Sequence, residues 1–420
     1  MKPIFKASNP ISRDDVLAWD LKDPLAGMRD RFALPENTIY LDGNSLGALP
    51  KATAQRVSRV VKQEWGEDLI RSWNKHDWMG LPQRCGAKIA GLIGAAAHEV
   101  VVADSTSINL FKLLAAALRL RPDRRVILSD TGNFPTDLYV AQGLIELLDK
   151  GHELRLVAPG EISEAINEDV AVVMLTQTDY RSGRIHNMAE ITAGAHGAGA
   201  LMLWDLAHSA GAFPVDLRGC GVDFAVGCGY KYLNGGPGAP AFLFVAEDLQ
   251  KEVRPPLSGW MGHEAPFLFD PDYRPAEGIA RNLCGTPAIL SLSALDEGLD
   301  VMRDAGMAAI RHKSVQMTDL FIALVDQNCA DFGFRLLSPR DPELRGSQIA
   351  FSHEQGYPIM AALIDRGVIG DFRAPDILRF GFAPLYLRFA DVWDAVDILR
   401  EIMTRKSWDQ PQFHKRMAVT

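Results

Sequence analysis

A lysine flanked by two tyrosines stands out among the residues that could carry chemistry. Lys231 lies in the stretch GCGYKYLNGGPGAP, residues 227–240, which is rich in glycine and proline. It follows an apolar run, so we expect it near a strand end, in a partly desolvated pocket where a neutral amine is nucleophilic. The glycines would clear space for a ligand. A surface lysine in a hairpin, with a turn at residues 234–236, is the alternative.

An acidic residue, Asp205, comes directly after the apolar run LMLW of residues 201–204. Because this run indicates a buried strand, we expect the carboxylate at the carboxyl end of a sheet, where it can pair with a cationic ligand group. A helix N-cap or a turn aspartate is the alternative.

Two further stretches place polar or aromatic side chains at the start of a helix. Ser and Thr lead into the helical pattern of residues 103–120, and hydroxyls with free N–H groups at a helix start make an anion site. N-capping alone is the alternative. In GNFPTDLY, residues 132–139, Phe134 can stack on a flat ring. Asp137 is its polar companion or a first-turn helix acid.

Together these features match the needs of one cofactor, pyridoxal 5'-phosphate (PLP). PLP requires a lysine for its aldehyde, a carboxylate for its pyridinium nitrogen, a phosphate cradle and a group flat against its ring. Lys231, Asp205, the hydroxyls near residue 106 and Phe134 are candidates for these roles. Tyr230 can offer its hydroxyl to the phosphate or to a proton transfer.

The composition bounds the class of protein that carries these residues. The 420 residues are 47% hydrophobic and have a net charge of −9, which argues against nucleic acid or an anionic membrane as partner. The five cysteines form no Cys-x-x-Cys pair, so free thiols are favoured over a zinc site or disulfides. The sequence contains no apolar leader and no segment typical of a membrane span, and we expect a soluble, cytoplasmic protein.

Short apolar runs alternate with helical patterns over most of the chain. Such runs indicate a mostly parallel sheet buried on both faces. The runs cover residues 125–130, 153–159, 170–177, 201–204 and 224–229. We predict an α/β fold with a large doubly wound, mostly parallel sheet domain and a small C-terminal α+β domain; the resemblance given below implies that it is the PLP-dependent transferase-like fold type I. A long helical pattern after Thr286, broken near Gly306, connects them.

Three regions follow from this organisation. Residues 1–50 form an N-terminal segment that contributes to the active site and to the small domain. Residues 51–295 form the PLP-binding domain, and residues 296–420 form the small domain, with strands expected at 347–353 and 377–383.

Several stretches make the chain resemble the kynureninases, fold-type I PLP enzymes related to the class V aminotransferases. The resemblance extends over nearly the whole chain. The stretches are YLDGNSLGALP (40–50), FPTD (134–137), WDLAHSAGA (204–212), GCGYKYLNGGPGAP (227–240), SGWMGH (258–263) and LRFGFAPLY (378–386). Asp and Lys alone would indicate only the PLP superfamily, whereas the first and last stretches, with SGWMGH, are more specific.

The resemblance implies three catalytic residues. Lys231 binds the PLP aldehyde covalently, Asp205 pairs with the pyridinium nitrogen, and Tyr230 relays a proton. His208 lies against the cofactor, unless it is a structural histidine donating to a backbone carbonyl. The implied cofactor-binding residues are Thr106, Ser107, Phe134, Pro135, Thr136, Asp137, Thr176, Asp205, His208, Tyr230, Lys231, Trp260 and Thr286.

Substrate recognition is implied for Arg379, which should clamp the α-carboxylate of an amino acid. Its pairing with Asp371 or Asp376 is the alternative. Asn44 and Ser45 should border the substrate pocket.

A homodimer with shared active sites is also implied. Trp260 and Thr286 are expected to reach the phosphate side of a neighbouring subunit's cofactor. As alternatives, Trp260 belongs to the core and Thr286 caps a helix.

The implied reaction is the hydrolysis of L-kynurenine, and of 3-hydroxy-L-kynurenine, by Cβ–Cγ cleavage. The products are anthranilate or 3-hydroxyanthranilate and L-alanine, in tryptophan catabolism or in the kynurenine pathway to NAD. The alternatives are a class V aminotransferase, a cysteine desulfurase using Cys284, a non-catalytic PLP-binding protein, or a different α/β enzyme.

Overall fold

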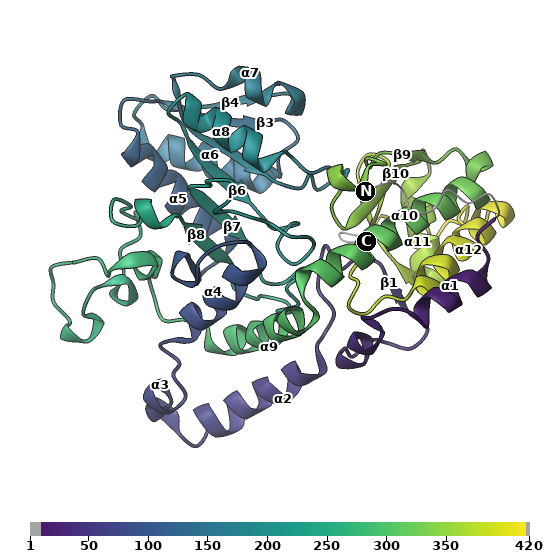
Figure 1. The fold of residues 1–420 in the computed structure, drawn as a ribbon, viewed down its shortest axis with the longest axis horizontal. Coiled ribbons are helices and arrows are strands. Elements are labelled where there is room, and N and C mark those ends of the chain that lie inside the picture. The colour runs from purple at the N-terminus through teal and green to yellow at the C-terminus, as the bar shows by residue number, and fades with distance from the viewer. Residues whose placement is uncertain (1–9, 417–420) are drawn as a thin grey trace.

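The computed structural model describes residues 10–416. It contains a seven-stranded sheet, a four-stranded sheet and a two-stranded pair, with helices packed around them (Figure 1). The large sheet and the smaller C-terminal part lie on opposite sides of the picture, joined by the helices α9 and α10. The predicted α/β fold with a small C-terminal α+β part is confirmed.

The large sheet has the strand order β2-β8-β7-β6-β5-β3-β4. Only β8 runs antiparallel to its neighbours β7 and β2. The strands are β2 (Val100–Val102), β3 (Val126–Asp130), β4 (Glu153–Val157), β5 (Val170–Thr176), β6 (Leu201–Asp205), β7 (Phe224–Gly227) and β8 (Phe242–Val245). The mostly parallel sheet is therefore confirmed, while β2 and β8 are strands that the sequence analysis did not indicate.

Helices cover both faces of this sheet, because successive strand residues point to opposite sides. On β5, Val172 and Met174 join a core with α5 and α6. Val173 and Leu175 join the core with α4, α8 and α9 on the other face. The helices of this part are α4 (Leu81–Leu92), α5 (Thr106–Leu120), α6 (Pro135–Leu148), α7 (Ile162–Ala165) and α8 (Met188–Gly197).

The smaller part is built on an antiparallel sheet in the order β12-β13-β10-β9. The N-terminal segment joins it, since β1 pairs in parallel with β11 and α1 packs against α12. The elements are α1 (Arg13–Asp20), β1 (Ile39–Tyr40), β9 (Arg335–Leu336), β10 (Gln348–Ser352), α11 (Gly356–Asp365), β11 (Val368–Ile369), β12 (Asp371–Arg373), β13 (Ile377–Gly381) and α12 (Phe389–Arg405).

The two parts are connected by α9 (Ile289–Ala305) and α10 (Met307–Asn328), which break at Gly306 as predicted. Gly306 has a φ of +77°, a conformation that favours glycine. Helix α9 packs on α4 and on α2 (Lys51–Arg59), whereas α10 packs on α12. The domain limits at residues 50 and 295 stay a prediction. Within residues 10–416, no helix combines the length and apolar character needed to cross a bilayer.

Candidate active site

Lys231 lies in the 228–241 connection between the antiparallel strands β7 and β8. It is half-buried, and its Nζ lies 5.7 Å from the ring centre of Tyr230. The backbone around it is anchored, because Gly47 N–H donates to the Tyr230 carbonyl at 2.8 Å and Asn234 N–H donates to the Lys231 carbonyl at 3.0 Å. The alternative prediction, a surface lysine in a hairpin, is therefore correct about the hairpin. It is wrong about the surface, because Lys231 lines a pocket.

The glycines around Lys231 have a different purpose from the one predicted. A Cβ on Gly229 would collide with the carbonyl oxygen of Pro240, and a Cβ on Gly227 would collide with the ring of Phe242. These glycines therefore let the lysine-bearing connection pack against β8. The expectation that they clear space around a ligand is wrong for these two positions.

Two carboxyl groups meet at the carboxyl end of the sheet. Asp205 is the last residue of β6, is 3% exposed and accepts from Ala207 N–H at 2.7 Å. Asp137, on the first turn of α6, lines the same pocket as Asp205 and accepts from Thr176 Oγ1 at 3.3 Å. Burial raises the pKa of both carboxyls, and the Asp205 charge raises that of Asp137 further. The Lys231 charge lowers the pKa of both carboxyls, but the pKa of Asp137 still lies well above its usual value, so Asp137 is the member that keeps a proton.

The start of α5 provides free hydroxyls. Ser105 is the N-cap and accepts from Ile108 N–H at 3.4 Å. Ser105 therefore caps the helix. The hydroxyls of Thr106 and Ser107 have no hydrogen-bond partner among residues 10–416. Both face the Lys231 pocket, where the helix N-terminus also favours an anion.

An aromatic pair closes another side of the pocket. Phe134, the N-cap residue of α6, is 40% exposed and packs edge-on against Tyr180, with ring centres 5.3 Å apart. Asn133 supports it by accepting from Phe134 N–H at 2.9 Å and from Thr176 N–H at 3.0 Å. Pro135 begins α6 but does not line the pocket.

These side chains surround a cavity of about 160 Å³. Most predicted cofactor residues line it: Thr106, Ser107, Phe134, Thr136, Asp137, Thr176, Asp205, His208, Tyr230 and Lys231, together with Tyr180 and Ala207. Burial raises the pKa of Tyr230, so its phenol stays protonated at neutral pH. The pocket therefore combines an amine, a shared carboxyl proton, a phenol and an anion cradle.

Arg379 lies on β13, beside this pocket, and is 2% exposed. Its Nε donates to Asp371 Oδ1 at 2.8 Å, and its Nη2 also contacts Asp371. Nη1 donates to the Tyr180 carbonyl at 2.7 Å and Nη2 to Ser45 Oγ at 3.0 Å. The pairing with Asp371 is therefore present, and that with Asp376 is not. One N–H on Nη1 has no partner among the described residues, so the guanidinium retains a free donor.

His208 is buried, and its Nδ1 lies 2.9 Å from Gln348 Oε1. Its predicted alternative, a bond to a backbone carbonyl, is not what the structure shows. Burial, with the positive charges of Lys231 and Arg379, holds the pKa of His208 well below its usual range. Asn44 is buried beside Gln348, with its amide 3.3 Å from Oε1.

Comparisons with known proteins show the family to which the chain belongs. A family model described as the kynureninase C-terminal domain matches residues 310–399. A kynureninase from Pseudomonas fluorescens is 55% identical over 414 residues, covering 97% of this chain and 100% of that protein. One from Burkholderia mallei (strain SAVP1) is 56% identical over the same length and shares. The chain belongs to the kynureninase family.

Solved structures similar to this family member show the same fold at low identity. A cysteine desulfurase from Thermococcus onnurineus NA1 has a TM-score of 0.77 at 19% identity, covering 90% of this chain and 98% of that one. The desulfurase CsdA from Escherichia coli has a TM-score of 0.74 at 20% identity, covering 91% and 98%. A C-DES mutant with glycine covalently linked to the PLP cofactor has a TM-score of 0.75 at 18% identity, covering 89% and 99%.

Besides Pro135, two residues expected at the kynureninase cofactor lie outside the Lys231 pocket. Trp260 is 36% exposed and packs edge-on against Phe267, so it is not a core residue. Thr286 is exposed and lines a separate cavity of about 300 Å³ with Asp104. It does not cap α9, whose N-cap is Ala288. Their expected place at a neighbouring subunit's cofactor stays a prediction.

Sequence analysis missed two side chains of this site. Tyr180 lines the pocket, and Gln348 contacts His208. Tyr180 comes four residues after the end of β5 at Thr176. Its position after a buried strand was the same kind of signal that indicated Phe134. Gln348 begins β10 without any local signal, because its role depends on packing between the two parts of the chain.

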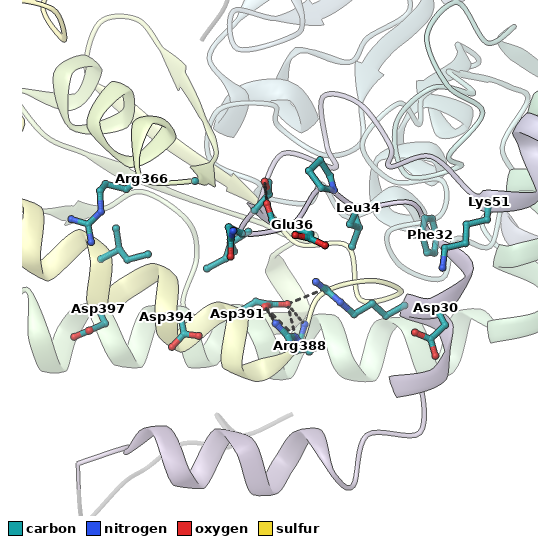
Figure 2. A pocket seen from close by; sticks show the side chains of 17 residues that line it. Asp30, Phe32, Leu34, Glu36, Lys51, Arg366, Arg388, Asp391, Asp394 and Asp397 are labelled. Carbon is teal, nitrogen blue, oxygen red and sulfur yellow. Dashed lines mark hydrogen bonds and ion pairs between the residues drawn. The ribbon is translucent and has the colours of Figure 1, made fainter.

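A larger hollow of about 680 Å³ lies elsewhere, between the N-terminal segment and α12 (Figure 2). Part of its charge is paired within the protein, since Asp391 pairs with Arg29 at 3.2 Å and with Arg388 at 2.7 Å. None of the predicted catalytic or cofactor-binding residues lines it. The predicted catalytic residues Lys231, Asp205 and Tyr230 line the smaller pocket instead.

Proposed function

We propose that this chain hydrolyses L-kynurenine to anthranilate and L-alanine with PLP as cofactor, by Cβ–Cγ cleavage in tryptophan catabolism. 3-Hydroxy-L-kynurenine is a second candidate substrate, with 3-hydroxyanthranilate as product. The observation that carries the proposal is the convergence of Lys231, Asp205 and a free-hydroxyl helix start on one pocket in a chain 55% identical to a named kynureninase.

The residues fit the chemical needs of PLP. Among residues 10–416, Lys231 is the only lysine that lines the pocket, and it suits the aldehyde, while Asp205 suits the protonated pyridine nitrogen. Thr106 and Ser107 suit the phosphate, because their hydroxyls are unpaired among the described residues and lie at a helix N-terminus. When bound, PLP supplies an electron sink for the bond-breaking step.

The chain's own groups then manage charge and protons. Asp205 keeps a negative charge opposite the pyridine nitrogen, while Asp137 retains its proton. The Lys231 amine takes and returns protons in the same pocket, and neutral Tyr230 donates one from its phenol. A positioned acid–base group of this kind contributes about 10²–10⁴-fold in rate.

The substrate carboxylate is assigned to Arg379. Its Nε and one Nη2 donor face Asp371, so the other edge of the guanidinium is the one left for a ligand. On that edge Nη1 has an N–H without a partner among residues 10–416, and the second N–H of Nη2 donates to the neutral Ser45 hydroxyl. A carboxylate that displaces this hydroxyl gains a bidentate, charge-assisted contact.

The related alternatives are less favoured. A desulfurase needs a mobile nucleophilic cysteine, but Cys284 donates to the Leu257 carbonyl at 2.9 Å and does not line the Lys231 pocket of its own chain. Burial also raises the pKa of this thiol, which lowers its thiolate fraction. A non-catalytic role would leave the complete set of acid–base groups without use.

A homodimer and a cytoplasmic location are part of the same proposal. Exposed apolar side chains continue from α2 along the chain at Val61, Trp65, Leu69 and Ile70, and a second group is formed by residues 267–269. Large exposed apolar surface of this kind marks an interface, and Trp260 lies next to the second group.

The decisive experiment follows anthranilate fluorescence after mixing PLP-loaded protein with L-kynurenine. Lys231→Ala should abolish product and remove the yellow colour of the bound aldehyde. Lys150→Ala, on an exposed lysine, is the matched control and should retain both. Turnover at the wild-type rate by the Lys231 variant would refute the assignment. Parallel kcat/KM values with 3-hydroxy-L-kynurenine define the preferred substrate.

A further inference from the structure

A glutamine from the small part of the chain contacts the histidine of the PLP pocket. His208 follows β6, and Gln348 is the first residue of β10. Both are buried, at 5% and 1% exposure, and His208 Nδ1 lies 2.9 Å from Gln348 Oε1. The contact thus joins the two sheets directly at the pocket.

The orientation of the Gln348 amide is fixed by the backbone. Its Nε2 donates to the carbonyl oxygens of Asp179 at 3.3 Å and Tyr180 at 3.1 Å. A carbonyl can only accept, so the amide nitrogen must face these two atoms and the amide oxygen must face His208. Rotating the amide by half a turn would oppose oxygen to two oxygens and leave buried donors unpaired.

The tautomer of His208 follows from this orientation. An amide oxygen at hydrogen-bond distance requires a proton on Nδ1. A neutral imidazole with a proton on Nδ1 carries a lone pair on Nε2. Nε2 has no hydrogen-bond partner among residues 10–416, and the ring lines the Lys231 pocket.

We propose that Gln348 is a positioning residue that fixes His208 as the Nδ1–H tautomer, so that Nε2 is a hydrogen-bond acceptor at the PLP pocket. Nε2 then accepts a hydrogen bond from a water, a hydroxyl or an ammonium group, and it does not donate one to an oxyanion. The matching ligand in the proposed hydrolysis is a donor such as the attacking water, and this step alone rests on the proposed function.

The test is a nitrogen spectrum of the imidazole rings in the full-length protein, with and without PLP. Ring-¹⁵N histidine labelling distinguishes a protonated nitrogen from one with a lone pair, and loss of one spin system in His208→Gln assigns the resonance. We expect a protonated Nδ1 and an unprotonated Nε2 in both forms. A proton on Nε2 of neutral His208 would overturn the proposal, whether or not the protein turns over kynurenine.

Variants separate positioning from general packing. Gln348→Met removes the acceptor and should move the proton to Nε2. Gln250→Met is the control, because Gln250 is also buried and donates to two backbone carbonyls, at 3.0 and 3.1 Å. It should leave the His208 pattern unchanged. An unchanged pattern in Gln348→Met would refute the role of Gln348. If that variant does not fold, the wild-type spectrum decides, because a proton on Nε2 of neutral His208 would still overturn the proposal.

Discussion

Asp371→Asn probes how the substrate clamp is held. Asp371 accepts hydrogen bonds from the Nε and Nη2 edge of Arg379. It also accepts one from Ser45 Oγ at 3.0 Å and pairs with Arg373 at 2.8 Å. Asparagine keeps the shape and one acceptor oxygen, but it removes the charge and presents an NH₂ group to a cation. The guanidinium therefore loses one of its two charge-assisted bonds and its fixed orientation.

The size of the effect follows from that single lost bond. Hydrogen bonds to charged groups contribute about 1.5–3 kcal/mol, and each 1.4 kcal/mol corresponds to about tenfold in binding. We expect KM for L-kynurenine to rise by about 10- to 100-fold, with kcat changed by less than about threefold because the carboxylate contact is similar in ground and transition states.

The assay is steady-state anthranilate fluorescence with a folding check by near-UV circular dichroism. Asp376→Asn is the matched control, since this acid lies in the same hairpin but forms no ion pair among the described residues. An unchanged KM in Asp371→Asn would show that Asp371 does not hold the clamp. A lower KM would show that Asp371 competes with the substrate for Arg379.

Three further perturbations test the electrostatics of the pocket. His208→Gln should reduce the acid sensitivity of folding. Because burial depresses the folded pKa of His208 below 6.5, the stability contributed by the neutral ring is present above that pH and is lost as pH falls through the folded pKa. Urea unfolding at neutral and acid pH measures this loss. An equal loss of stability in wild type and variant would contradict the prediction. Asp137→Asn should raise the Tm of the apoprotein at neutral pH. Because the folded pKa of Asp137 is raised, this carboxyl stabilises the fold below the unfolded pKa of 3.8, and the stabilisation is lost as pH rises through the folded pKa. A higher Tm of the variant that persists at more acid pH would show that the carboxyl charge is not the reason for the increase. Lys112→Met removes a fully buried lysine that pairs with Asp104, just before the α5 hydroxyls. It should weaken binding of PLP more than binding of pyridoxal in absorbance titrations, and equal losses would exclude a link to the phosphate.

The residues that sequence reasoning placed correctly owe their position to their own strand. Asp205 and Thr176 end β6 and β5, and these parallel strands end at the same edge of the sheet. An apolar run followed by a polar residue is enough to indicate such a position. The position of Lys231 could be predicted for the same reason, because it follows the apolar strand β7. The purpose of its glycines could not, since they pack against β8 and do not clear space.

Partners that depend on strand register could not be predicted in this way. Asp371 and Asp376 are both acids near Arg379 in the sequence. In the structure Asp371 stands directly opposite Arg379 in the β12–β13 ladder, whereas Asp376 lies in the turn between these strands. A shift of one residue would move the carboxylate to the other face. The sequence alone did not specify that register.

The hydrogen bonds to the Tyr180 carbonyl show why the polar network of the site could not be predicted from short stretches of sequence. It accepts from Arg379 Nη1 at 2.7 Å and from Gln348 Nε2 at 3.1 Å. One backbone oxygen of the large part thus orients both the clamp and the glutamine that contacts His208. Displacing the small part would break both bonds together. Substrate recognition and the state of the pocket histidine are therefore linked through the packing of the two parts, which no single segment encodes.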